Sequence, residues 1–323
     1  MTLHTTQRSR IPFVLVITAA LVGVLLGTFE IANTSVGWHL ASGRWVIENS
    51  SVPSHDPFAF SSESVEWVDH EWLFQTGAAL IHRYGGGEAL SLARSLFIAG
   101  LAVLLFVIGC RSGLSPPVAL ALSAVCIAGA RPRFFLRPEL VTLVVVPAAV
   151  WIFLDRDRHS TKFWLPGLAA VMVVGANAHR AALVVPILLT GILAASFVEM
   201  AVLGKWRPET LKSGSLGVVT AITALLVNPY GWRLFAVPFQ LNALVDQPHI
   251  PNPEWIPPTV RSSPMLFAVI IISALVLAIG ERRAARWSLF IMAVGLAMRH
   301  IRNLGLFFVL LPLAIAPSLA RWK

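Results

Sequence analysis

The chain is dominated by apolar runs that short polar segments separate. The first run, residues 11–28, follows Arg8 and Arg10 and ends without a small-residue cleavage site, so it predicts a retained first helix rather than a signal peptide. Further apolar runs occupy 88–110, 116–130, 139–154, 163–178, 181–203, 214–228, 264–280, 287–298 and 303–319. Several are shorter than the roughly 20 residues of a full span, as is typical of bundles around a water-filled cavity. We expect an all-α polytopic membrane protein with about ten transmembrane helices.

Two longer polar segments interrupt this pattern, at 33–87 and 229–263. Within the first, Ser35–Asn49 has tryptophans at helical spacing, which predicts an interfacial helix in the head-group zone. A second short helix is expected over Glu71–Tyr84, ending at three consecutive glycines, 85–87. The second segment contains the proline-rich stretch 251–258. We expect both segments to be loops on the same, outer face, within one transmembrane domain that covers residues 1–323.

Composition supports this interpretation. Hydrophobic residues make up 56% of the chain and charged residues only 13%, whereas soluble domains have about 25% charged residues. Cys110 and Cys126 both lie in apolar runs and are interpreted as small core residues. The net charge of +9 comes from arginines and lysines in short loops, where they orient helices or meet anionic lipid head groups. No nucleic-acid partner is expected.

The distribution of basic residues predicts the orientation. With the N-terminus inside, the inner loops hold fourteen basic residues, including all four lysines, and the outer segments hold ten, all of them arginines. We therefore expect a multi-pass protein of a bacterial inner membrane with both termini cytoplasmic. Many arginines nevertheless remain on the outer side.

The acidic candidates for chemistry lie in or beside the first polar segment. Asp69, His70 and Glu71 are consecutive, so on a regular helix they point in different directions, and one of them would act as general base or metal ligand. The alternative is that the acids offset a helix macrodipole. Asp56 before a proline is either functional or part of an Asx turn. Glu30, at the outer end of the first helix, is a further candidate. A divalent metal is compatible with these residues, but no cluster requires one.

The basic candidates fall at three helix junctions. They are Arg131, Arg133 and Arg137; Asn177, His179 and Arg180; and Arg299, His300 and Arg302. Guanidinium groups near a membrane face suit phosphate recognition, because their planar fork matches phosphate oxygens. The alternative is that they neutralise loop acids or extend to lipid head groups. His39, Tyr230, Glu254 and Trp255 are expected to border the same cleft. The chain has no glycine-rich nucleotide loop, nucleophile elbow or zinc spacing.

A series of motifs along nearly the whole chain resembles a bacterial family of the C-type (GT-C) glycosyltransferase superfamily. They are WHLASGRWVIENSSVPSHDPFAFS, WVDHEWL, LRPEL, NAHR, NPYG, EWIPP and RHIRNLGLF. The resemblance implies a helical bundle with two outer loops, an acidic catalytic residue in the first loop and a polyprenyl-phosphate sugar donor. It implies catalytic roles for Asp69, Asp56 or Glu30, and phosphate binding by the outer arginines with His179 and His300.

Two positions depart from the pattern of that superfamily. Asn33-Thr34-Ser35 stands where an acidic motif is expected, and Arg180 stands where a glycine is usual. No soluble C-terminal domain is expected after the last helix. Two hypotheses therefore remain open: a sugar transferase at the outer face, or an inactive relative that binds a lipid or a partner protein within a complex. A transporter has less support, because no internal repeat is found.

Overall fold

The computed structural model describes residues 11–58, 66–240 and 253–322, and within these ranges it is helical. The long helices are α1 (Phe13–Gly27), α2 (Ser35–Asn49), α3 (Trp72–Arg111), α4 (Pro116–Ala130), α5 (Glu139–Leu154), α6 (Thr161–Ala178), α7 (Val184–Leu203), α8 (Pro208–Ala224), α10 (Pro264–Gly280), α11 (Ala284–Arg299) and α12 (Leu304–Leu319). Short 3-10 helices are η1 (Arg131–Arg133), η2 (Arg156–Arg158), η3 (Arg180–Leu183), η4 (Gly231–Ala236), η5 (Pro253–Trp255) and η6 (Ile301–Asn303). Parts of both predicted outer loops, 59–65 and 241–252, lie outside the described residues.

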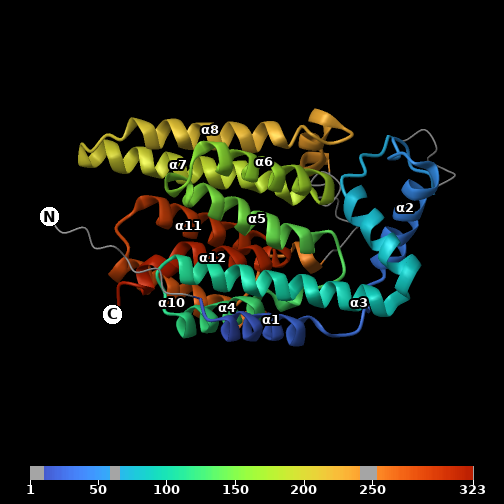
Figure 1. The fold of residues 1–323 in the computed structure, drawn as a ribbon, viewed down its shortest axis with the longest axis horizontal. Helices are drawn as coiled ribbons and strands as arrows, with labels where there is room; N and C mark the ends of the chain where they lie inside the picture. Colours follow the sequence, from blue (N-terminus) through green and yellow to red (C-terminus); the bar gives the residue numbers. More distant parts are fainter. Residues whose placement is uncertain (1–10, 59–65, 241–252, 323) are drawn as a thin grey trace.

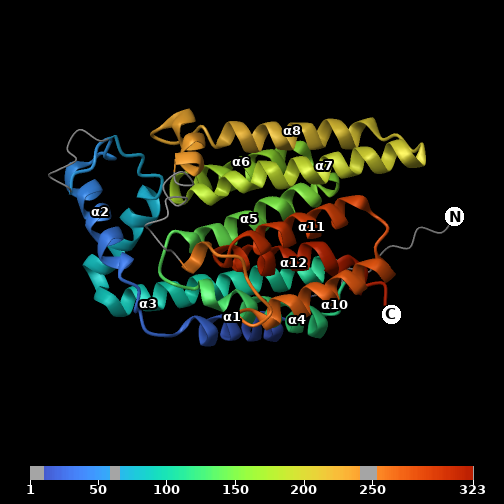
Figure 2. The ribbon, with the colours of Figure 1, turned by 180° about the vertical axis from the view of Figure 1, so that it is seen from behind.

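The long helices lie side by side along the longest axis of the molecule (Figures 1 and 2). Helices α6, α7 and α8 form one edge of the bundle, α1 and α4 lie toward the other, and α5, α11 and α12 lie between them. Helix α2 and the start of α3 project at one end. The first turns of α1 and the end of α12 pack together away from α2, because Ile11 and Leu15 share a cluster with Leu319. Both ends of the described chain are therefore on the side opposite α2.

Helix α12 is the centre of the bundle. It packs against α4, α5, α10 and α11, and Phe307 is fully buried. The peripheral helices instead expose large apolar side chains, for example Phe13 on α1, Val202 on α7 and Ile279 on α10. Such surfaces are unfavourable in water and suit a lipid environment. The apolar helices thus indicate a membrane protein.

Three helical segments in the described part of the chain are long and apolar enough to cross a membrane: Trp72–Arg111, Arg180–Leu203 and Ile301–Leu319. The helices α1, α5 and α10 are apolar but shorter. Every apolar run in the sequence is helical in the structure, so the predicted helices are present. That about ten of them cross the membrane stays a prediction.

The glycine-rich break in the first outer loop lies where the sequence predicts it. Two helical parts of α3 meet at a kink at Gly86, whose φ of 63° and ψ of −158° are non-helical. These angles are accessible almost only to glycine. The bend turns the first part of α3 across the end of the bundle, against α2 (Figure 1). The residues just before α3 are thereby held over the junctions of the other helices.

Candidate functional site

The carboxylate of Glu71 lies at the centre of a ring of three histidines. Its Oε1 is 3.4 Å from His70 Nε2 and 3.9 Å from His179 Nε2, and its Oε2 is 3.8 Å from His39 Nδ1. These residues come from α2, the start of α3 and the α6–η3 junction. The Glu71 side chain retains 18% exposure, so solvent or a ligand has access to it.

Local backbone features hold this ring together. His179 has extended φ and ψ of −168° and 131°, which end α6 and turn its imidazole inward, where Nδ1 lies 2.7 Å from Thr142 Oγ1. The Trp72 indole donates a 2.9 Å hydrogen bond to Asn177 Oδ1, which ties the start of α3 to the end of α6. Helix α2 approaches α3 closely at Gly43, so that His39 faces the site.

The protonation states follow from burial and charge. Burial lowers the pKa of His39 and lowers that of His179 well below its usual value, although Glu71 opposes both effects. Both imidazoles are therefore expected to be neutral near pH 7. Burial raises the pKa of Glu71, but the hydrogen bond and charge of His70, with the other two histidines, bring it down to about 2. Glu71 is thus the ionised carboxylate of the site.

Asp69 has the opposite character. Its side chain is 1% exposed, and Oδ2 has no hydrogen-bond partner in the described structure, like the neighbouring Gln75 Oε1. Burial, and then the Glu71 charge, raise the pKa of Asp69 to about 7. A proton on Asp69 would satisfy a buried oxygen that otherwise carries an unpaired charge. Asp69 is therefore a buried carboxyl that is about half protonated near pH 7.

The raised pKa of Asp69 predicts a pH-dependent stability. A carboxyl whose pKa is 3.8 unfolded and about 7 folded contributes stability that is complete below pH 3.8 and is lost as the pH rises through 7. From pH 5 to pH 8 the wild type should lose roughly 2–3 kcal/mol relative to Asp69→Asn, which has no such proton to lose. Thermal unfolding of both proteins in detergent, across that range, measures the difference. A constant difference would contradict a raised pKa.

Two arginines face the ring from the other side. Arg180 Nη1 lies 3.2 Å from His70 Nε2, and the charges of Arg180 and Arg302 both act on His179. His70 Nδ1 lies 3.2 Å from the Val68 carbonyl oxygen, to which it can donate. His70 Nε2 lies between Arg180 and Glu71, so it can accept from Arg180 when the ring is neutral and donate to Glu71 when the ring is protonated. No carboxylate oxygen in the described chain comes within 4.0 Å of the Arg180 or Arg302 guanidinium. Two guanidinium groups that lack a carboxylate partner among the described residues therefore border the ring formed by Glu71 and the three histidines.

Two arginines of the α4–α5 connection, Arg133 and Arg137, have carboxylate partners. Arg133 donates to both oxygens of Glu139, and Glu254 of η5 contacts both Arg133 and Arg137. Arg137 Nε also donates to Ser35 Oγ at 3.2 Å. At residues 33–35, where the resemblance implies an acidic motif, the Ser35 hydroxyl is therefore the group that contacts Arg137.

The second outer loop is tied to η6 beside these charges. His300 Nδ1 lies 2.6 Å from the Trp255 carbonyl oxygen, and the Arg302 guanidinium lies 4.8 Å from the centre of the Trp255 indole. The amide of Ile301 donates to the Ile256 carbonyl oxygen at 2.9 Å. Residues from the three arginine-bearing junctions therefore lie at the α2 end of the bundle (Figure 1).

The remaining candidates lie apart from the Glu71 ring or make local contacts. Asp56 Oδ1 accepts from the Phe58 amide at 2.9 Å, as in the Asx turn given as its alternative. Glu30 is exposed between α1 and α2. Arg131 is exposed and stacks over Phe29.

Two further candidates join segments or lie at the edge. Tyr230 donates a 2.6 Å hydrogen bond to the Pro53 carbonyl oxygen and so connects the two outer loops. Burial raises its pKa, so its phenol stays protonated. Arg299 is exposed and contacts His300. Of the residues named from the sequence, His39, His70, Glu71, His179 and Arg180 form the most compact group.

Sequence reasoning assigned no role to Glu139 or Gln75. Glu139 was present in the LRPEL motif, six residues after Arg133, which is a spacing that no regular helix brings together. Its position beside Pro138 at the first turn of α5 was the available signal. Gln75 carried no signal, because its importance comes from burial beside Asp69.

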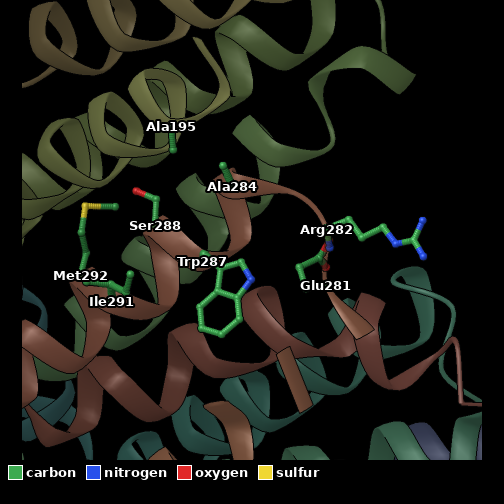
Figure 3. A pocket seen from close by; sticks show the side chains of 8 residues that line it. All are labelled: Ala195, Glu281, Arg282, Ala284, Trp287, Ser288, Ile291 and Met292. Atoms are coloured by element: carbon green, nitrogen blue, oxygen red, sulfur yellow. The ribbon is translucent and has the colours of Figure 1, made fainter. Parts of the chain in front are cut away.

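Two grooves occur at opposite ends of the molecule. One groove, of about 490 Å³, lies between the start of α3 and the ends of α6 and α8. Its wall includes Trp72 and Asn177, which are next to the Glu71 ring. The other, of about 540 Å³, lies at the α7–α11 contact, with Trp287 and Met292 in its wall (Figure 3). It is near the C-terminus, because Glu281 in its wall hydrogen-bonds Ser318. The first groove offers apolar surface beside the charged site.

No group of three or more His, Cys, Asp or Glu side chains within the described residues is arranged to hold a metal ion. The three histidines around Glu71 point at a carboxylate rather than at a shared vacant centre. No protein-family model matches this chain, and a search of curated proteins finds no significant sequence match. Membership of the glycosyltransferase superfamily stays a prediction from the motifs.

Proposed function

We propose that this protein is a membrane glycosyltransferase that moves a sugar from a polyprenyl-phosphate donor at the outer face of a bacterial inner membrane. About ten spans, both termini in the cytoplasm and two outer loops are part of this proposal. The observation that carries it is the ionised Glu71 ringed by His39, His70 and His179 and faced by Arg180. This arrangement places a proton acceptor beside a guanidinium group that would hold the departing phosphate.

The chemistry assigns His70 as general base. Its Nε2 lies 3.2 Å from Arg180 Nη1, from which the neutral ring accepts, and 3.4 Å from Glu71 Oε1. A phosphate that binds Arg180 would free Nε2 to take the proton of an acceptor hydroxyl, and Glu71 would stabilise the imidazolium that forms. Arg180 and Arg302 would stabilise the charge that develops on the leaving phosphate. Asp69, one of the carboxylates considered from the sequence, is only 1% exposed, so this proposal gives the role of base to His70.

The position of the 490 Å³ groove supports a lipid donor. Its apolar wall includes Val174 and Leu226, which are exposed, and Asn177, two residues before His179. An isoprenoid chain in this groove would keep its apolar surface out of water while its phosphate reaches the arginines. Other anionic lipids have the same combination of an apolar chain and a charged head group. In this proposal the protein lies in the bilayer, from which such lipids enter the groove.

The test is transfer by the purified protein in vesicles, from a radiolabelled polyprenyl-phosphate sugar to added acceptor sugars. His70→Gln should reduce kcat about 10²-fold or more, because it removes the general base. It should leave donor binding within a few-fold of wild type, since the arginines remain. Wild-type protein without transfer to any acceptor, or His70→Gln with full activity, would contradict the proposed mechanism.

The alternative is an inactive relative that binds a lipid or a partner protein within a membrane complex. The observation that favours it is the pairing of Arg133 and Arg137 with Glu139 and Glu254, which neutralises cations that a phosphate would use. The same assay separates the two functions, because this alternative predicts donor-lipid binding without transfer.

A further inference from the structure

Four charged side chains form a connected set between the α4–α5 connection and the second outer loop. Within this set, Arg133 and Glu139 form an ion pair with two hydrogen bonds: Arg133 Nε lies 2.9 Å from Glu139 Oε1, and Nη2 lies 2.6 Å from Oε2. Their side chains are 4% and 13% exposed. This two-point geometry fixes the guanidinium of Arg133 in place.

Glu254 comes from a different segment, η5, and its side chain is more exposed than that of Glu139. Its Oε1 accepts from Arg137 Nη1 at 2.9 Å, and its Oε2 accepts from Arg133 Nη2 at 3.3 Å. The side chains of Arg137 and Glu254 are 30% and 28% exposed. Both arginines lower the pKa of Glu254, against the effect of burial, so it is ionised.

The charge balance defines what Glu254 does. Arg133 and Arg137 carry two positive charges, and Glu139 cancels one of them. The second is cancelled by Glu254, whose two oxygens are spread across two guanidinium groups. That is the arrangement in which arginines bind the oxygens of a phosphate.

We propose that Glu254 is a tethered competitor in an anion site built from Arg133 and Arg137, and that a phosphate ester binds there by displacing it. The inference rests on the proposed function, because that function supplies a phosphate ester as the ligand. Glu139 keeps the Arg133 guanidinium oriented while the phosphate ester replaces Glu254. Glu254 thereby sets which anions bind, because a ligand must hold two arginines better than one carboxylate does.

The contacts of the neighbouring residues link this exchange to the Glu71 ring. Trp255, next to Glu254, is hydrogen-bonded by His300 and stacked by Arg302. Arg302 in turn acts on His179. Displacement of Glu254 would therefore disturb the η5–η6 contact and free Arg302 to turn toward the ligand.

The test is a binding titration of the full chain in detergent, with inorganic diphosphate as one probe and a short-chain polyprenyl phosphate as the other. Glu254→Gln removes the competing charge but keeps the side-chain shape, so it should bind at least one probe about tenfold more tightly than wild type, which is about 1.4 kcal/mol. Binding of the lipid alone identifies a lipid head group as the ligand, whereas binding of both shows that the phosphate suffices. Adding Arg137→Met to Glu254→Gln should abolish the gain.

Glu66→Gln is the matched control, because Glu66 pairs with Arg233 at 3.5 Å on an exposed surface. It changes the net charge equally and should leave both affinities unchanged. The proposal is overturned if Glu254→Gln binds neither probe more tightly, or if Glu66→Gln gains as much. These results are independent of sugar transfer: tighter binding without turnover would remove the proposed function and leave the anion site standing.

A second measurement on the wild type avoids any folding defect of the variants. Hydrogen exchange of residues 299–304 reports the hydrogen bond from the Ile301 amide to the Ile256 carbonyl oxygen. A saturating probe should speed exchange at this amide about fivefold or more, because the η5–η6 contact opens. Unchanged or slower exchange with the probe bound would contradict displacement of Glu254.

Discussion

Glu71→Gln should abolish sugar transfer, with a reduction in kcat of about 10³-fold, within the range for loss of a charged partner of a general base. The amide has the same shape as the carboxylate but cannot stabilise an imidazolium on His70, which lies 3.4 Å away. It also removes the negative charge of Glu71 that acts on Arg180. The measurement is single-turnover transfer from a labelled polyprenyl-phosphate sugar in vesicles.

Asp69→Asn and Glu66→Gln are the informative comparisons for this prediction. Asp69 is buried and about half protonated near neutral pH, so the Asp69→Asn variant should retain activity within about tenfold there. Glu66 is exposed and should be silent. If Asp69→Asn were as inactive as Glu71→Gln is expected to be, and Glu71→Gln were active, the assignment of the two carboxyls would have to be reversed.

Gly43→Ala should separate α2 from α3 and give the largest loss of stability. A Cβ at this position would lie 2.0 Å from the Gln75 carbonyl oxygen and 2.4 Å from its carbon. Backbone atoms cannot move aside as a flexible side chain can, so the helices must part, at a cost of about 3 kcal/mol. His39 would then move away from Glu71, and transfer activity should fall as well. Thermal unfolding in detergent and the transfer assay measure the two effects.

Gly37→Ala is the matched control on the same helix. No atom lies within 4 Å of a Cβ built there, and alanine favours a helix over glycine by up to about 1 kcal/mol. This variant should therefore be neutral or slightly more stable. Equal destabilisation by both substitutions would show that helix propensity, rather than the close approach of α2 and α3, controls this region.

Helix positions were largely predictable. The runs 116–130, 139–154 and 264–280 coincide with α4, α5 and α10, and the predicted helix Ser35–Asn49 coincides with α2. Two of these begin with proline at the first turn, which presets the helical φ and lacks an amide that would be unsatisfied there. The bend in α3 was placed correctly at the glycines, but whether the helix would continue beyond them depended on packing against α1 and α4.

The roles of individual charged residues were less predictable. Asp69 and Glu71 are two positions apart, yet burial raises the pKa of Asp69 to about 7, while contacts with the histidines, His70 first, lower that of Glu71 to about 2. Arg133 and Arg180 looked equivalent in the sequence, but only Arg133 contacts a carboxylate within 4.0 Å among the described residues. A side chain's neighbours set its pKa and its availability, and these neighbours come from distant segments.

The sequence by itself determined the apolar helices, the two polar segments and the types of side chain that could do chemistry. These features follow from local pattern, because apolar runs become helices wherever backbone groups must bond within their own segment. Only the tertiary structure decided that Glu71, rather than Asp69, is the accessible carboxylate. It also decided that Glu254 occupies the arginine pair. The reason is that desolvation and ion pairing depend on contacts between residues tens to more than a hundred positions apart, such as His39, Glu71 and His179.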